Sequence, residues 1–266
     1  MKRLLITGAA GGLGRILRAG LAGYADCLRL SDIAEMDPAG ASEEAFVCDL
    51  ADRQAVFALV DGCDGIVHLG GISVEAAFDD ILRSNLLGTY NLYEAARRVG
   101  GPRVLFASSN HTIGFHRRTT RLDETAPLRP DSLYGVSKCY GEALSRYYFD
   151  KFGVESVCVR IGSCFPEPAD RRQLSTWLSP KDFVSLVKAV FDAPFIGHLV
   201  LYGVSNNRQT WWNNDHASFL GWLPQHSSER FRSKVEAAHP PEDGDDPAVK
   251  FQGGSFAAAG HFEHQR

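Results

Sequence analysis

The chain has 266 residues, of which 44% are hydrophobic and 23% are charged, and its formal net charge at pH 7 is −4. These values describe an ordinary globular protein that is long enough to bury a full core. The negative charge argues against the basic footprint of a nucleic-acid-binding protein, and no stretch approaches the roughly 20 apolar residues of a membrane span. We therefore expect neither a nucleic-acid partner nor a membrane partner.

Six cysteines are scattered along the chain without the paired spacing of metal ligands, and the nine histidines include no H-x-x-x-H pair. Isolated thiols of this kind are typical of a reducing compartment. The first apolar run is only five residues long and ends in a glycine turn, which is not the design of a secretory signal. The sequence therefore predicts a cytoplasmic protein without a metal site.

The first fourteen residues join an apolar run, Arg3 to Thr7, to the turn GAAGGLG, and a helical pattern follows. A strand, a glycine turn and a helix N-terminus form an anion site, because unpaired N–H groups and the helix dipole point to one place. Glycines in this motif permit the tight turn, the approach of a pyrophosphate and close helix packing. Three glycines alone would also suit a plain turn, but the flanking strand and helix favour dinucleotide binding. The expected cofactor contacts here are Gly8, Gly11, Gly12, Leu13 and Gly14.

A second predicted strand, residues 27–31, ends at Asp32, which lies 24 residues beyond Gly8. Dinucleotide-binding folds place an acid near this position, on the hydroxyls of the adenosine ribose. The alternative is a carboxylate in an exposed turn. No arginine follows Asp32 to receive a 2′-phosphate, so the sequence predicts NAD rather than NADP.

Further strands are expected at residues 45–48, 65–69, 103–107 and 154–161, and helices at 53–60, 79–99 and 133–152. This alternation predicts a Rossmann-type, doubly wound parallel sheet with helices on both faces. Ligands of such sheets bind beyond the carboxyl ends of the strands. The residues expected there as further cofactor contacts are Asp32, Ile33, Asp49, Leu50, Leu69, Gly70, Gly71 and Ser73.

The rhythm of strands and helices weakens after residue 161, although a helix at 182–191 and a strand at 199–202 are still expected. Residues 112–131 and the acidic run 240–247 are predicted to be loops. We therefore expect an NAD-binding domain over residues 1–161 and a small substrate-binding region, integrated with it, over 162–266.

Tyr134 and Lys138 stand four residues apart and share one face of a predicted helix. A phenol titrates near pH 10, so it is a poor base at neutral pH unless a lysine ammonium and a cationic nicotinamide favour the phenolate. The alternative is a pair of exposed helix residues, but after a dinucleotide fingerprint the spacing indicates a catalytic pair. Ser109 or Asn110, at the mouth of the preceding strand, would hold the substrate oxygen.

These motifs resemble the extended, epimerase/dehydratase-like branch of the short-chain dehydrogenase/reductase superfamily. The likeness covers residues 1–160 through TGAAGGLG, Asp32, NLLGTYNLYEAA and YGVSK. A narrower likeness spans nearly the whole chain: HLGGISVE, FASSNHTIGF, RPDSLYGVSKCYGE, VRIGSCFPEP, STWLS and FQGGSF together resemble the bacterial uronate dehydrogenases. That family oxidises the anomeric hydroxyl of galacturonic or glucuronic acid with NAD and yields an aldarolactone.

The resemblance implies a role for each matching residue. It makes Tyr134 the base and places Lys138 on the nicotinamide ribose and the tyrosine, with Ser109 completing the catalytic set. Asn110 stands where epimerases carry a serine or threonine, which leaves open whether Ser109 or Asn110 polarises the substrate. The residues implied around the sugar acid are Ser73, Ser109, Asn110, His111, Tyr134, Ser163 and Arg172.

A bound carboxylate needs a local cation, which Arg171 and Arg172 supply, although adjacent loop arginines are equally typical of a solvated surface. We expect Arg172 to read the carboxylate. We also expect a homo-oligomer, in which residues 252–256 could reach a neighbouring subunit's site. The competing interpretations are a sugar-nucleotide epimerase or dehydratase and a non-catalytic dinucleotide sensor.

Overall fold

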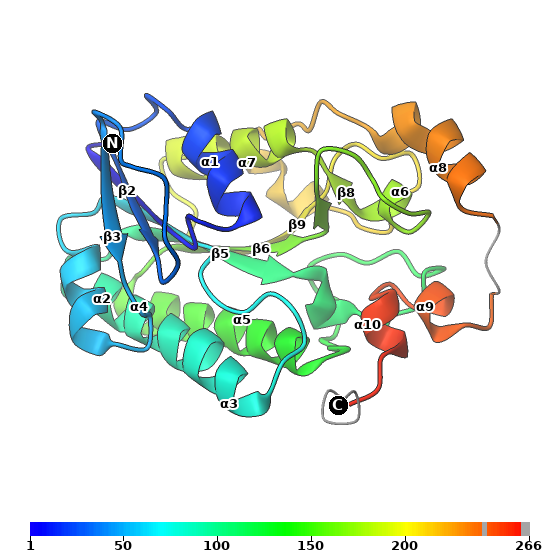
Figure 1. Cartoon of the computed structure of the whole chain (residues 1–266), viewed down its shortest axis with the longest axis horizontal. Helices are drawn as coiled ribbons and strands as arrows, with labels where there is room; N and C mark the ends of the chain where they lie inside the picture. The colour runs from blue at the N-terminus through cyan, green and yellow to red at the C-terminus, as the bar shows by residue number, and fades with distance from the viewer. Residues whose placement is uncertain (241–243, 262–266) are drawn as a thin grey trace.

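The computed structural model describes residues 1–240 and 244–261 (Figure 1). Within them, seven strands form one sheet in the order β3-β2-β1-β4-β5-β6-β9, and every neighbouring pair is parallel. The order reverses between β1 and β4, which is the switch point of a Rossmann sheet. The expected doubly wound fold is confirmed. The strands are β1 Arg3–Thr7, β2 Cys27–Asp32, β3 Glu43–Val47, β4 Gly65–His68, β5 Arg103–Ser109, β6 Ser156–Ile161 and β9 His198–Gly203.

Helices cover both faces of the sheet (Figure 1). One layer contains α1 (Gly12–Gly20) and α7 (Pro180–Asp192), which bury Leu17 and Phe183 in one core. The other contains α2 (Arg53–Val60), α4 (Gly88–Arg98) and α5 (Leu133–Phe152), which bury Val56, Tyr93 and Tyr148 in a second core. Because helices cover both faces of the sheet with apolar side chains, polar side chains gather at the carboxyl ends of the strands.

The helix expected at 79–99 is not regular. It consists of α3 (Phe78–Ile81), a π-helical turn η1 (Leu82–Leu87) and α4. The apolar spacing did not reveal one widened turn, because a single π turn shifts the pattern only slightly. In this turn Asn85 donates to the carbonyl of Ile72 and accepts from its N–H, at 2.9 and 2.8 Å, and also donates to Ser137 Oγ at 2.9 Å. Asn85 therefore ties the π-helical turn to the loop that contains Ile72 and to α5.

Two other segments refine the expected elements. Strand β5 runs to Ser109, two residues further than expected, because Ser109 still pairs with Ile161 in β6. The polar segment after it begins as a 3₁₀ turn, η2 (Asn110–Ile113), and continues as a loop with isolated bridges from Arg117 to Phe251 and from Leu122 to Trp212.

Residues beyond 161 contribute to both parts of the molecule. A small sheet pairs β7 (Ser163–Cys164) with β8 (Trp177–Leu178), which directly follows α6 (Gln173–Thr176). By contrast, β9 is a strand of the main sheet, and α7 packs into the core on one face of that sheet. The expected boundary at 161 stays a prediction, and the two expected parts share one sheet. The remaining elements are η3 (Asp215–Leu220), η4 (Ser228–Phe231), α8 (Arg232–Ala238), α9 (Pro247–Lys250) and α10 (Ser255–Ala258).

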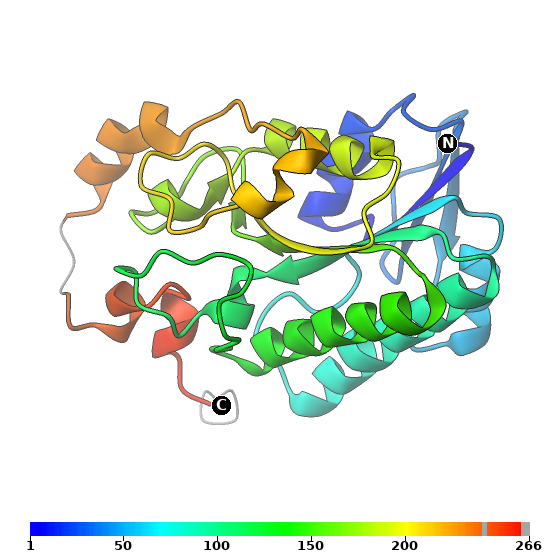
Figure 2. The same cartoon turned by 180° about the vertical axis from the view of Figure 1, so that it is seen from behind.

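The view from behind shows α9 and α10 beside the loop that follows β5 (Figure 2). Of the loop expected at 240–247, residues 241–243 lie outside the described residues, and Pro247 begins α9. No helix among the described residues combines the length and apolar character needed to cross a bilayer.

Candidate active site

The turn between β1 and α1 can be built only from small residues. Gly8 has φ +71°, and a Cβ added there would lie 2.8 Å from the nitrogen of Gly70. A Cβ on Gly14 would lie 2.3 Å from the Gly8 carbonyl oxygen. A Cβ on Gly12 would face open space, and Gly11, the N-cap of α1, provides no side-chain cap. The first N–H groups of α1 are thus open to an anionic ligand, as the motif predicts.

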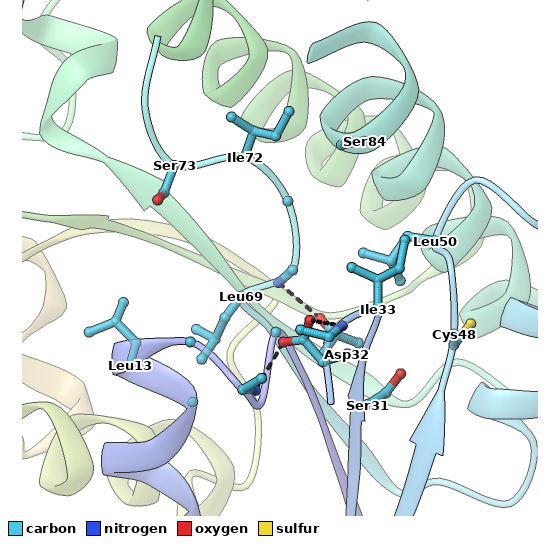
Figure 3. A pocket seen from close by; sticks show the side chains of 18 of the residues that line it. Leu13, Ser31, Asp32, Ile33, Cys48, Leu50, Leu69, Ile72, Ser73 and Ser84 are labelled. Carbon is cyan, nitrogen blue, oxygen red and sulfur yellow. Dashed lines mark hydrogen bonds between the residues drawn. The ribbon is translucent and has the colours of Figure 1, made fainter. Parts of the chain in front are cut away.

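A pocket of about 500 Å³ lies at the carboxyl ends of β1, β2 and β4 (Figure 3). Its volume is within the range of small-molecule and cofactor sites. The structure brings together all the cofactor contacts predicted outside the catalytic helix. Those that line the pocket are Gly8, Gly11, Gly12, Leu13, Gly14, Asp32, Ile33, Asp49, Leu50, Leu69, Gly70, Gly71 and Ser73.

Two carboxylates at the pocket are held by main-chain groups. Asp32 accepts from the N–H groups of Ala10 and Ala34, at 2.9 and 3.0 Å, which ties the end of β2 to the glycine turn. Asp49 accepts from Ala51 N–H at 2.9 Å and from the Arg83 guanidinium at 2.6 Å. These contacts, the Ala51 N–H foremost, keep the pKa of Asp49 below its usual value despite partial burial. Both carboxylates are therefore held at fixed positions.

Tyr134 and Lys138 of α5 and Ser109, the last residue of β5, are all buried. The lysine ammonium lies 5.6 Å from the centre of the tyrosine ring. Burial raises the pKa of Tyr134, while a hydrogen bond with Ser109 opposes that rise. Burial also lowers the pKa of Lys138 to about 8. In the protein alone, the pKa of Tyr134 is therefore raised by burial, which is opposite to the lowering that the lysine was expected to cause. Of the two residues considered for polarising the substrate, Ser109 is the one that hydrogen-bonds to the phenol of Tyr134.

Asn110 is turned toward the neighbouring arginine. Its amide fits its surroundings when the nitrogen donates to the Ile161 carbonyl at 3.1 Å and the oxygen accepts from Arg172 Nη2 at 2.6 Å. Arg172 Nε donates to the Gln252 carbonyl at 2.7 Å, and burial lowers the pKa of Arg172 to about 10. Arg172 is thus a desolvated cation that still carries its charge at neutral pH.

Arg171 points elsewhere. It donates to the carbonyls of His239 and Glu236, and its guanidinium lies 3.9 Å from the Glu236 carboxylate. The two adjacent arginines therefore have different surroundings, and only Arg172 reaches Asn110.

His111 lies between a buried carboxylate and two aromatic rings. Its Nδ1 is 2.9 Å from Asp131 Oδ2, and the Asp131 side chain has no exposed surface. The imidazole stacks on Phe256 with ring centres 3.9 Å apart and meets Tyr134 edge-on at 5.7 Å. Asp131 and Phe256 were not predicted as site residues. Asp131 stands in RPDSLYGVSK, which carried the family resemblance, but its pairing with His111 depends on contacts across 20 residues.

The remaining predicted residues differ in their surroundings. Ser73 is exposed on the loop after β4 and lines the pocket, whereas Ser163 is buried in β7 with its hydroxyl 3.0 Å from Thr176 Oγ1. Residues 252–256 lie against their own chain in this structure, and the expectation that they reach a neighbouring subunit's site stays a prediction. The N–H of Gln252 donates to the His116 carbonyl at 2.8 Å and that of Gly253 to the Gly114 carbonyl at 2.9 Å, so this segment packs against its own chain's site.

Within residues 1–240 and 244–261, no group of three His, Cys, Asp or Glu side chains is placed to hold a metal ion. All six cysteines are free thiols, and burial raises the pKa of Cys158 and Cys164. The polar groups that remain at the site, a phenol, an ammonium, hydroxyls and a guanidinium, suit proton transfer beside a bound dinucleotide.

The sequence model of the NAD dependent epimerase/dehydratase family matches residues 4–193. The chain belongs to this family. Within the NAD-dependent epimerase/dehydratase family, the chain is 55% identical over 261 residues to a uronate dehydrogenase of Pseudomonas putida, a match covering 98% of this chain and 97% of the relative. The narrower resemblance to the uronate dehydrogenases is therefore confirmed.

Solved structures agree with this placement within the NAD-dependent epimerase/dehydratase family. A tyrosine-to-alanine variant of uronate dehydrogenase from Agrobacterium tumefaciens, complexed with NAD, has 58% identity and a TM-score of 0.97, covering 98% of this chain and 99% of that chain. A glucuronic acid dehydrogenase from Chromohalobacter salexigens has 56% identity and a TM-score of 0.97, covering 98% of both chains.

Proposed function

We propose that this protein oxidises the anomeric C1 hydroxyl of a hexuronic acid, galacturonate or glucuronate, to the aldarolactone with NAD. The observation that carries the proposal is the half-buried cation Arg172, which stands beside Asn110 next to His111 and Tyr134. The full-length likeness to uronate dehydrogenases supports the same substrate class.

The residues of the pocket fit NAD. Gly11 and Gly12 leave the N-terminus of α1 open to the pyrophosphate, and Asp32 is fixed at the end of β2 for the adenosine ribose hydroxyls. Bound NAD supplies a nicotinamide ring that accepts a hydride. Lys138 would hold the nicotinamide ribose, and the loop with Gly70, Gly71 and Ser73 would follow the other ribose and the ring.

Tyr134 is the base of the proposed reaction. It takes the proton of the C1 hydroxyl, the hydrogen on C1 leaves as a hydride to the nicotinamide, and the C1–O bond becomes the lactone carbonyl. Burial alone disfavours the phenolate, so the ammonium of Lys138 and the positive charge of the oxidised ring must offset it. Ser109, which hydrogen-bonds to the Tyr134 phenol, polarises the C1 hydroxyl of the substrate. Asn110 accepts a hydrogen bond from Arg172 and helps to hold that side chain in place.

Arg172 reads the substrate carboxylate in this proposal. A guanidinium has five N–H donors, of which one goes to the Gln252 carbonyl and one to the Asn110 oxygen, so three remain. Three donors are enough for a two-point contact with a carboxylate. His111, Ser73 and Ser163 are proposed to contact the sugar hydroxyls.

One assay tests the function. NAD reduction is followed with galacturonate, glucuronate, glucose and a UDP-sugar. Turnover with the two uronates and little with glucose is the expected result. Turnover of the UDP-sugar alone would favour the epimerase or dehydratase alternative, and NAD binding without any turnover would favour the sensor.

We also propose that the protein is a cytoplasmic homo-oligomer. Large apolar side chains stay at least 40% exposed on the layer formed by α3, η1 and α5, which suits burial against another copy; they are Phe78, Leu82, Leu87, Val136 and Tyr147. The six free cysteines suit a reducing compartment. Sedimentation equilibrium measures the oligomeric state, and a monomer at micromolar concentration would contradict it.

A further inference from the structure

The first turn of α5, the helix that carries Tyr134, has every one of its main-chain donors satisfied. The first N–H groups of a helix have no partner within the helix. In α5, Val136 N–H makes the first bond of the helix, to the Ser132 carbonyl at 2.9 Å, and Gly135 N–H donates to the N-cap hydroxyl of Ser132 at 2.9 Å. The N–H groups of Leu133 and Tyr134 are not satisfied by any residue next to them in the sequence.

Glu75 accepts both of these remaining N–H groups. Its Oε1 is 3.1 Å from the Leu133 nitrogen and its Oε2 is 3.0 Å from the Tyr134 nitrogen. Glu75 is about 60 residues earlier in the chain, on the loop after β4 that also carries Ser73. Among the residues that the structure describes, no cation pairs with Glu75, so the helix start is its partner.

The same loop is fixed at a second point. Asn85 holds both main-chain groups of Ile72 and donates to Ser137 Oγ, and that hydroxyl donates to the Tyr134 carbonyl at 2.7 Å. Figure 3 shows Ile72 and Ser73 on this loop beside the cofactor pocket. The N–H and the carbonyl of Tyr134 are thus both linked to the loop, one through Glu75 and the other through Ser137 and Asn85.

We propose that Glu75 is a positioning residue for Tyr134, because it locks the N–H of the proposed base to the loop that forms the cofactor wall. The inference rests on the proposed function of Tyr134. A carboxylate with two acceptor oxygens fixes both the distance and the rotation of the first helical turn. Misplacement of a reacting group by about 1 Å costs on the order of 100-fold in rate.

The test compares the full-length wild type with Glu75→Gln, Glu75→Asp and the control Asp79→Asn. The Gln variant keeps the size of Glu75 but turns an amide NH₂ toward one of the two N–H groups. The Asp variant keeps the charge and both acceptor oxygens. Asp79 is exposed in the first turn of α3 on the same segment, so its variant removes a similar charge without removing a hydrogen bond to the start of α5.

Three measurements are made on each variant: kcat and KM for both uronates, Kd for NAD, and hydrogen exchange of the peptide that spans residues 133–136. For Glu75→Gln we expect kcat to fall about 10- to 100-fold by the same factor on both uronates, with KM and Kd within about twofold. Exchange at the start of α5 should become about tenfold faster. Glu75→Asp should recover part of the loss, and Asp79→Asn should match the wild type.

Other outcomes overturn the inference. Faster exchange with unchanged kcat would make Glu75 a stabilising cap alone. A loss that differs between the uronates or appears in KM would make it a substrate contact, and a weaker Kd would make it a cofactor contact. An active wild type with an equally active Gln variant would overturn only this inference, whereas a wild type that oxidises neither uronate would overturn the proposed function.

Discussion

Arg172 Nε donates to the main-chain carbonyl of Gln252, 2.7 Å away, although 80 residues separate them. The carbonyl fixes one edge of the guanidinium, and the Asn110 amide engages another. A cation held on two sides is preorganised, so little side-chain entropy is lost when a carboxylate binds. This relationship makes Arg172, rather than its neighbour, the residue to test first.

Arg172→Ala should lower kcat/KM for galacturonate roughly 30- to 3,000-fold. Removal of one partner of a desolvated charge pair costs about 2–5 kcal/mol, and each 1.4 kcal/mol is about tenfold. Arg172→Lys should recover only part, because an ammonium does not form the planar two-point contact. Steady-state kinetics with galacturonate and neutral galactose separate the effects, since the alanine variant should lose almost nothing further on galactose.

Arg171→Ala is the matched control for that prediction. Its guanidinium is directed to His239 and Glu236, so galacturonate kinetics should stay within a fewfold of the wild type. A full loss at Arg171 would move the carboxylate contact by one residue. An equal loss on both sugars at Arg172 would show that it shapes the loop instead of reading charge.

Tyr134→Phe should lower turnover at least about 100-fold and leave NAD binding in place. The ring and its packing remain, while the only proposed base is lost, and general-base catalysis contributes about 100- to 10,000-fold. Turnover and NAD titration are measured on the same preparation. A loss below tenfold would refute the assignment, and lost NAD binding would indicate a damaged fold.

NAD should be preferred to NADP by a wide margin in kcat/KM. The Asp32 carboxylate is immobilised by the N–H groups of Ala10 and Ala34, so it cannot swing away from a 2′-phosphate. A like-charge contact in a partly desolvated site disfavours binding. Equal efficiency with the two cofactors would show that Asp32 does not face the ribose.

His68 should make the protein less stable in acid. Burial, with a further contribution from Lys138, lowers the pKa of His68 to about 3, and its ring nitrogens lie 2.8 and 3.2 Å from the hydroxyls of Thr7 and Thr89. Between pH 6.5 and about 3 the unfolded chain binds a proton that the folded chain does not, so the free energy of unfolding falls by up to about 1.4 kcal/mol per pH unit.

Urea unfolding at pH 6.5, 5.5 and 4.5 measures this dependence. The comparison is with His68→Gln, which can still hydrogen-bond to the two threonines and cannot titrate. The variant should lose stability less steeply than the wild type as the pH falls. Identical slopes would mean that His68 takes up its proton in the folded state.

Much of the cofactor half could be predicted from the sequence, because its signals are local. The run from Arg3 to Gly14 predicts a strand, a turn and the start of a helix from consecutive residues. Asp32 follows at the distance along the chain that this fold requires. The spacing of Tyr134 and Lys138 is likewise one turn of a helix. The strand order then brings these separate signals to one edge.

The contacts around the proposed substrate site could not be predicted in the same way, because they join residues that are far apart in the sequence. Arg172 donates to the main-chain carbonyl of Gln252, and every residue has such a carbonyl, so the residue type gives no indication of this contact. Asp131 lay in a stretch that was correctly expected to be a loop, yet its partner is His111. Glu75 caps a helix whose own sequence offers only Ser132, so no local capping pattern indicates it.

The contact of Gln252 with Arg172 also has a consequence for the order in which the protein acquires its abilities during synthesis. Chains emerge from the ribosome N-terminus first, and segments fold as they become available. The dinucleotide turn, Asp32 and the catalytic helix are complete long before residue 252 is made. Arg172, the proposed carboxylate contact, therefore gains the main-chain carbonyl that fixes its guanidinium only after the residues that line the cofactor pocket have been made.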